Sequence, residues 1–320
     1  MRRYIAARIL QSVVVTFIVT TIAFFVVRAA PGDPFSYESR PLPPAVRQQL
    51  RAQFGFDKPL PEQFVRYVAN VARGNFGYSF GKQESVHDAI AQALPRTLLL
   101  AGVALTLAFG LGLVIGVMQA ARRGGWFDRV TSGVLLFFYS VPDFWAALVL
   151  MVAFSSWWRL LPSGNIVDPV MHDYMPGWMA FIDRARHLIL PAASLTLLSM
   201  AAVARYQRAA MLEVLPSDFV RAARAKGLSE RAVIWRHALR NALAPMTTLL
   251  GLMLPVFIGG AVFVERVFAW PGIGSLATDA LAGRDYDVVC ATVIVGAVVV
   301  ILGNLAADLL HLAIDPRIRE

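Results

Sequence analysis

Long apolar runs constrain this chain more than any other feature. A helix needs roughly 20 mostly apolar residues to cross a bilayer. The sequence holds six such runs: Ile9–Val27, Thr97–Ala121, Val134–Trp158, Leu188–Ala204, Ala242–Val264 and Val288–Ala307. Only 16% of the residues are charged, whereas soluble domains carry roughly 25%. We therefore predict an all-α membrane protein with six transmembrane helices.

Two of the runs allow more than one interpretation. The run at Val134–Trp158 contains Asp143 directly after Pro142, so it is either one helix or two shorter pieces. The first run follows Arg2, Arg3 and Arg8 and could be mistaken for a signal peptide. Its apolar stretch of 19 residues is longer than the roughly 7–15 residues of a signal core. We expect a retained membrane anchor there.

The basic residues predict the orientation, because cytoplasmic segments of membrane proteins are enriched in Lys and Arg. With both termini in the cytoplasm, the inner segments carry sixteen Lys and Arg against seven Asp and Glu. The outer segments then carry fourteen of each. All of the net charge of +9 lies on one side, which favours an N-in, C-in topology.

The largest inner segment is a basic loop at residues 205–241. Pro216 ends any helix that precedes it. Ser217 or Asp218 can then cap a new helix that runs to about Lys226. Gly227 suits the left-handed position that closes a helix. Ser229 then caps an amphipathic helix that leads into the fifth apolar run.

Three interpretations of this loop are open from its composition. A DNA-reading helix-turn-helix is disfavoured, because a recognition helix must be free to enter a groove and this one continues into a membrane span. A solvated basic loop would satisfy the charge rule and do nothing more. The third interpretation is a docking element, in which the small side chains of Ala222, Ala223 and Ala225 press into a groove on a partner.

The loop resembles the EAA loop of permease subunits of bacterial ATP-binding-cassette importers. Arg221-Ala222-Ala223 followed by Gly227 matches the first half of that motif, with Arg in place of Glu. The stretch DFVRAARAKGLSERAVIWRHALRNALAP is similar to the dipeptide and oligopeptide branch throughout. Further landmarks of that branch are APGDP, FGFDKPLPEQFVRYV, GNFGYSF, SVPDFW, HLILPAASL and FAWPGIG. The chain departs from the branch at Arg284–Ala291.

The resemblance implies the first permease type, with a type I importer fold and an extracytoplasmic insertion after helix 1. It implies that the chain lies in the bacterial inner membrane in contact with membrane lipid. It also implies a second permease subunit, two ATPase subunits that bind ATP and Mg²⁺, and an extracytoplasmic substrate-binding protein. The helix near Ser217–Lys226 would be the coupling helix. Its coupling residues would be Asp218, Phe219, Arg221, Ala222, Ala223, Lys226 and Gly227.

The same resemblance divides the chain at residue 96. Residues 1–96 would hold the first helix and an extracytoplasmic segment. The residues of that segment predict short helices at 44–54 and 61–73, the second turning Phe64, Val65, Val68 and Val71 inward. Residues 97–320 would form a five-helix core whose translocation path includes Met253, Pro255 and Phe257. Two further expectations come from the residues: Gly112 and Gly116 suit close helix packing, and Trp157, Trp158, Trp178 and Trp270 suit membrane interfaces.

The sequence points to no chemistry on this chain. It lacks a G-x-x-x-x-G-K-[ST] phosphate loop, so ATP would be hydrolysed by other chains. We find no cofactor motif, no catalytic constellation and no metal-ligand spacing among its five histidines. The function that the resemblance implies is import of di- or oligopeptides by alternating access. The alternatives are the same machinery carrying nickel or glutathione, an ATP-independent channel or secondary carrier, and a membrane-tethered DNA-binding regulator.

Overall fold

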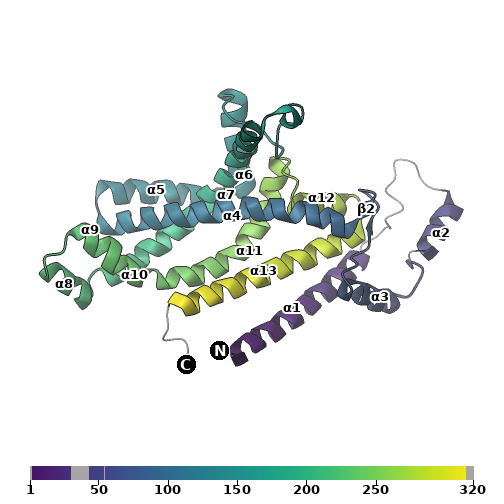
Figure 1. The fold of residues 1–320 in the computed structure, drawn as a ribbon, viewed down its shortest axis with the longest axis horizontal. Helices are drawn as coiled ribbons and strands as arrows, with labels where there is room; N and C mark the ends of the chain where they lie inside the picture. The colour runs from purple at the N-terminus through teal and green to yellow at the C-terminus, as the bar shows by residue number, and fades with distance from the viewer. Residues whose placement is uncertain (1, 30–42, 54, 315–320) are drawn as a thin grey trace. The chain divides into compact units, whose positions relative to one another are not determined.

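The computed structural model describes residues 2–29, 43–53 and 55–314, and nearly all of them lie in helices (Figure 1). Contacts between residues group the chain into two compact units. Unit 1 comprises residues 1–97 and 271–301, and unit 2 comprises residues 98–270 and 302–320. The helices α4 (Val86–Ala121) and α13 (Tyr286–Ile314) belong partly to each.

Unit 1 contains the N-terminal helix and the segment that follows it. Its elements are α1 (Arg2–Ala29), α2 (Pro44–Gln53), α3 (Leu60–Ala72), β1 (Tyr78–Ser79), β2 (Glu84–Ser85) and α12 (Ile273–Ala282). The strands are antiparallel, with Tyr78 opposite Ser85. Helix α3 packs Tyr67 against Phe24, Cys290 and Ile294. Val65, which we predicted to face inward, is 67% exposed, because it lies on the opposite side of α3 from Tyr67.

Two aspartates of α13 and the turn before it hold unit 1 together. The Ser79 hydroxyl donates to Asp285 Oδ2 at 2.7 Å, and the Gly81 N–H donates to the same oxygen at 3.2 Å. Asp287 forms an ion pair with Arg28 at 3.4 Å. Both aspartates come from the stretch at 284–291, and their contacts tie the start of α13 to the β1–β2 turn and to α1.

Unit 2 is organised around a 38-residue helix, α7 (Gly177–Val214). Its other elements are α5 (Trp126–Ser140), α6 (Asp143–Met151), a π-helical turn η2 (Val152–Trp157), a 3₁₀ turn η3 (His172–Tyr174), α8 (Asp218–Ala225), α9 (Glu230–Ala232), a π-helical turn η4 (Val233–Ala238), α10 (Leu239–Ala242) and α11 (Ala244–Val267). Helices α5, α6 and α11 all contact α7.

Five helices in the described part of the chain are long and apolar enough to cross a membrane. They correspond to five of the six predicted runs. The run around Asp143 is instead two helices, Trp126–Ser140 and Asp143–Trp157, bent by 105°. The residue before a proline avoids helical backbone angles, and Val141 is extended with ψ of 134°. The open question about this run is thus resolved as two pieces, which give a sixth span only when counted together.

Two glycines of α4 allow it to lie directly against α7. A Cβ atom on Gly116 would sit 2.5 Å from the Ala204 carbonyl oxygen, and one on Gly112 would sit 2.8 Å from Val203 Cβ. This confirms the predicted packing role of the pair. The prediction for α7 was too short, because the helix continues ten residues past Ala204 to Val214. Arg205 and Arg208 therefore lie on a packed helix and not in the loop.

Candidate functional site

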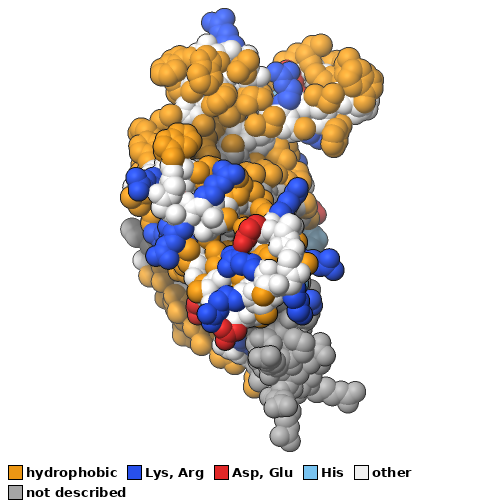
Figure 2. All heavy atoms as spheres, turned by 90° about the vertical axis from the view of Figure 1, so that its left-hand side faces the viewer, with side chains coloured by type: hydrophobic (Ala, Val, Ile, Leu, Met, Phe, Trp, Pro, Cys, Tyr) orange, Lys and Arg blue, Asp and Glu red, His pale blue; other side chains and the backbone are white. Residues whose placement is uncertain are grey.

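The segment from Ser217 to Ala242 forms one end of unit 2 and is rich in basic residues. Figure 2 shows Lys and Arg side chains gathered on this end, over α8, α9 and α10. Exposed bases on it are Arg221, Arg224, Lys226, Arg231, Arg236 and Arg240. The exposed acids are Asp218 and Glu230. A surface with this charge excess suits a partner with an acidic or carbonyl-lined groove.

Helix α8 is anchored by two small apolar side chains. Val220 is fully buried and Ala223 is 6% exposed, and both pack in a cluster with Val117, Met211 and Val233. The three-residue spacing places them on one face of the helix. Phe219 and Ala222 lie on the other face and are exposed. The helix thus has one side fixed to unit 2 and one side free.

Gly227 closes α8 in a left-handed conformation, with φ of +77°. Its N–H donates to the Arg224 carbonyl at 2.9 Å, and the next N–H, of Leu228, donates to the Ala223 carbonyl at 3.4 Å. This pair of bonds is a Schellman motif, which satisfies carbonyls left open at the helix end. The predicted position and conformation of the turn are confirmed.

Side-chain contacts hold α8 to the turn and to α9. The Arg224 guanidinium donates to Glu230 across the turn at 2.7 Å. Ser229 accepts a hydrogen bond from the Ala232 N–H, so it caps α9 as predicted. Ser217 does not cap α8 with its side chain, because its hydroxyl donates back to the Val214 carbonyl at 2.6 Å. Asp218 pairs with Arg221 on the exposed side.

The structure brings the seven predicted coupling residues together on one short helix and its turn. Asp218, Phe219, Arg221, Ala222 and Lys226 are exposed, whereas Ala223 faces inward. Ala223 therefore positions the helix and does not offer a surface to a partner. Gly227 shapes the turn.

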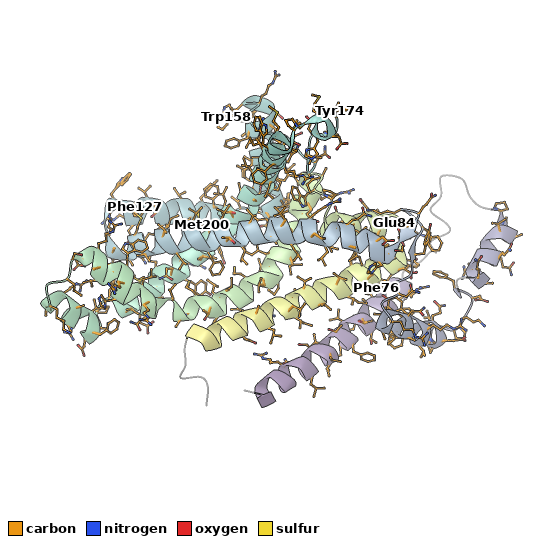
Figure 3. The ribbon with its side chains drawn as sticks, in the orientation of Figure 1. Phe76, Glu84, Phe127, Trp158, Tyr174 and Met200 are labelled. Carbon is orange, nitrogen blue, oxygen red and sulfur yellow. The ribbon has the colours of Figure 1, made fainter. Side chains whose placement is uncertain are left out.

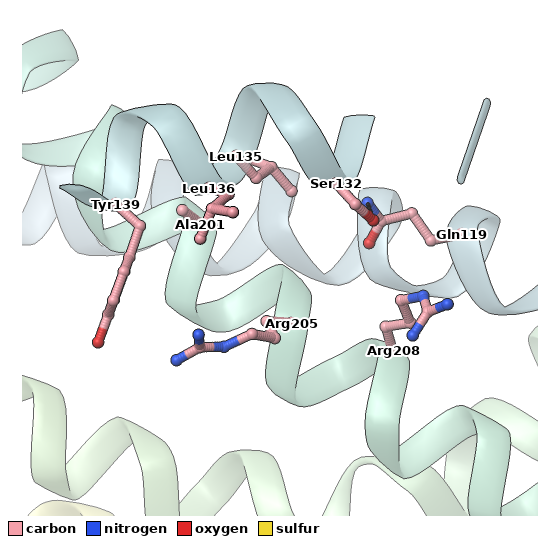
Figure 4. Close-up of a pocket in the computed structure, with 8 residues that line it drawn as sticks. All are labelled: Gln119, Ser132, Leu135, Leu136, Tyr139, Ala201, Arg205 and Arg208. Atoms are coloured by element: carbon pink, nitrogen blue, oxygen red, sulfur yellow. Dashed lines mark hydrogen bonds between the residues drawn. The ribbon is translucent and has the colours of Figure 1, made fainter. Parts of the chain in front are cut away.

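A buried polar network lies next to this segment, and sequence reasoning missed it. Arg208 on α7 donates to both carboxylate oxygens of Asp128 on α5, at 2.8 and 2.9 Å. Asp128 also accepts from the Gly124 N–H at 2.9 Å. Gln119 of α4 donates to Thr131 at 2.8 Å and lies beside Arg208 (Figure 4). The sequence does hold one indication of this pairing. Asp128 comes just after Gly124-Gly125 and near the end of a span, where an unpaired charge is costly.

A second missed feature is a cavity of about 360 Å³ between α7, α11 and the α5–α6 bend. Helix α7 contributes one face to it: Leu195, Leu198, Ser199, Ala202, Arg205 and Tyr206. Helix α11 contributes Leu249, Leu252, Met253, Val256 and Phe257. The bend contributes Tyr139, Val141 and Asp143. We call this the α7–α11 cavity. Of the three predicted path residues, Met253 and Phe257 line it and Pro255 does not.

The Arg205 guanidinium lies 4.7 Å from the centre of the Tyr139 ring, a distance at which cation–π attraction operates. Figure 4 shows the two side chains pointing to the same side of α5 and α7. Both also line an adjoining cavity of about 260 Å³, together with Ser132 and Arg208. The two cavities therefore meet at Arg205 and Tyr139.

The loop between η2 and α7 forms a third, polar cavity. Asp183 accepts from the Asp168 N–H at 3.0 Å and lies 2.7 Å from His172 Nδ1 and 3.1 Å from His187 Nδ1. The N–H groups of Met171 and Val170 donate to the Asp168 carboxylate and lower its pKa. Within the described ranges, no cluster of three or more His, Cys, Asp or Glu is suited to a metal ion.

The aromatic residues predicted at membrane interfaces divide into two groups. Trp157, Trp158 and Trp178 are at least 60% exposed. Trp158 and Tyr174 point outward at the end of η2 and before α7 (Figure 3). Trp270 is 1% exposed and belongs to the core of unit 2. The interface prediction for Trp270 was wrong, because its indole is enclosed in the core cluster and has no surface left for a membrane interface.

Family models and relatives agree with this architecture. Residues 112–320 match the family described as binding-protein-dependent transport system inner membrane component, and residues 1–101 match its N-terminal family. The chain belongs to this family of membrane permease components and is a multi-pass protein of the bacterial inner membrane.

Three curated relatives align along their whole length. The chain is 38% identical to the oligopeptide transport system permease protein AppB of Bacillus subtilis, with 99% of each chain covered. It is 40% identical to the di/tripeptide transport system permease protein DppB of Pseudomonas aeruginosa, covering 100% of this chain and 99% of the relative. It is 38% identical to the dipeptide permease DppB of Escherichia coli, with 98% of each covered.

A solved structure, titled as an inward-facing conformation of the MetNI methionine ABC transporter, shares the fold. The TM-score is 0.58 at 18% identity, covering 71% of this chain and 96% of that chain. At this identity the likeness defines the fold alone.

Proposed function

We propose that this chain is the first permease subunit of an ATP-driven importer for di- and oligopeptides. It would pair with a second permease, receive peptide from an extracytoplasmic binding protein, and alternate between inward- and outward-facing states. Two ATPase subunits would bind and hydrolyse ATP with Mg²⁺. The peptide relatives at 38–40% identity support the substrate class.

The observation that carries the coupling part of the proposal is the two-sided character of α8. Val220 and Ala223 fix one face to unit 2, and the exposed face carries Phe219 and Ala222 between charged residues. A push on the free face is therefore transmitted to the buried cluster that joins α8 to α4, α7 and η4. This arrangement fits a helix seated in a cleft of an ATPase, with N-in, C-in topology placing it in the cytoplasm.

The test is the composition of the complex and its response to a bulky residue. Purification of the tagged chain from its native membrane in mild detergent is expected to bring a second permease and ATPases with phosphate loops. Ala222→Trp should reduce ATPase retention and peptide uptake more than ten-fold, because the indole cannot enter a close groove. Ala222→Ser is the matched control and should behave as wild type. A chain that purifies alone, yet transports with an ion gradient, would overturn the proposal.

A further inference from the structure

Two charged side chains on the helices of unit 2 have no hydrogen-bond or ion-pair partner among the described residues, Asp143 being half-buried and Arg205 exposed. Asp143 and Arg205 both line the α7–α11 cavity. Throughout the described ranges neither forms a hydrogen bond or ion pair, and Arg205 contacts only the Tyr139 ring electrostatically. The nearby Arg208, one turn further along α7, is fully paired with Asp128. Ionisable groups inside membrane segments are costly and mark substrate or ion pathways.

The rest of the cavity wall is apolar. Leucines on α7 and apolar side chains on α11 provide most of it. The other polar groups in its lining are Tyr139, Ser199 and Tyr206. Small-molecule sites have this composition: mostly apolar walls with a few polar groups that fix orientation. The charges are one of each sign. The complementary ligand is therefore a molecule with an anionic group, a cationic group and apolar substituents between them.

The dimensions restrict the length of this ligand. The α7 face of the cavity runs from Leu195 to Tyr206, which is about 16 Å of helix at 1.5 Å per residue. An extended peptide spans roughly 3.5 Å per residue, so a di- or tripeptide occupies about 7–11 Å. The volume of about 360 Å³ is at the lower end of the roughly 300–1,000 Å³ seen for ligand pockets. Long peptides would not be enclosed.

We propose that the α7–α11 cavity is a transient binding site for short peptides with free termini. Arg205, held by the Tyr139 ring, receives the C-terminal carboxylate, since a guanidinium binds carboxylates through two parallel hydrogen bonds. Asp143, at the start of α6, receives the N-terminal ammonium. This inference rests on the proposed function and adds to it: the permease itself selects for zwitterionic peptides, in addition to any selection by a binding protein.

The experiment measures binding to the complete transporter in detergent without a binding protein. The probe is an Ala-photoleucine-Ala tripeptide, crosslinked by light and mapped by mass spectrometry. We expect crosslinks on α11 near Met253. Unlabelled Ala-Leu-Ala should compete at least about ten-fold better than its C-terminal amide or its N-acetyl form, because each blocked form loses a charge-assisted hydrogen bond.

Substitutions of Arg205 and of Asp143 test the two ends of the peptide separately. Arg205→Gln should remove the preference for a free carboxylate and leave the preference for a free amine, and Asp143→Asn should do the reverse. Arg205→Lys should retain part of the carboxylate preference, which shows that the variant chains fold. Arg129→Gln, an exposed arginine outside the cavity, is the control and should change neither ratio.

The outcomes separate the two proposals. If wild-type transporter imports peptides but the probe crosslinks elsewhere, or the competition ratios are unchanged in both variants, the cavity is not a peptide site. The same conclusion follows if both variants lose all subunit assembly, because the charges then pair with the second permease. If wild type imports no peptide but takes up another substrate, the proposed function fails first.

Discussion

Replacing Gly227 tests whether the turn after α8 sets the position of that helix. The residue has φ of +77°, and a Cβ atom there would meet nothing within 4 Å. A substitution therefore adds no clash, and its cost is the backbone strain alone. A left-handed conformation costs an ordinary L-residue roughly 1–2 kcal/mol, with asparagine tolerating it better. We expect the local stability of α8 to fall in the order Gly, Asn, Ala, Val.

Hydrogen exchange of the α8 amides gives the direct measurement. A loss of about 1–2 kcal/mol raises the open fraction roughly 5- to 30-fold. Gly227→Val should therefore speed exchange at Val220–Ala225 by about that factor, while α4 and α7 exchange as before. Peptide uptake by the Gly227→Val variant should fall as α8 loses stability, and its membrane insertion should not change.

Gly133→Ala is the matched control. Gly133 also has open space around its Cβ position, but it lies inside α5 with ordinary helical angles. Alanine there should stabilise its helix by about 1 kcal/mol and leave α8 exchange unchanged. If Gly227→Val protects α8 as well as wild type does, the turn does not position the helix and the reasoning is refuted.

Three further changes probe contacts inside the individual units. Gly116→Val should lower the thermal midpoint of the purified protein by forcing α4 from α7, at a cost of about 1–3 kcal/mol, whereas Gly110→Val, with open space, should not. Asp128→Ala leaves Arg208 without its partner and should cost about 2 kcal/mol, measured by denaturant unfolding; an unchanged midpoint would show the pair is dispensable. Asp285→Ala frees the Ser79 hydroxyl, and limited proteolysis should then cut the 79–82 turn faster; equal rates would contradict its anchoring role.

The helices were largely predictable because each carries its own signal. Apolar runs of about 20 residues, Gly227, and the caps around Ser229 are local features whose physics needs no distant partner. The bend after Ser140 was left open by the sequence, since a proline can either kink a helix or end it. The end of α7 was misplaced because Arg205 and Arg208 read as loop charges when their surroundings are unknown.

Composition and local pattern by themselves determined a helical, multi-pass membrane protein with a basic two-helix segment and a left-handed turn. Only the tertiary structure decided which side of α8 is buried, that Ala223 anchors it and that Asp128 meets Arg208. It alone placed Asp143 and Arg205 in one cavity, although 61 positions separate them in the chain. The physical reason is that charge pairing and cavity formation depend on which helices pack together, and α7 brings distant segments into contact through its whole length.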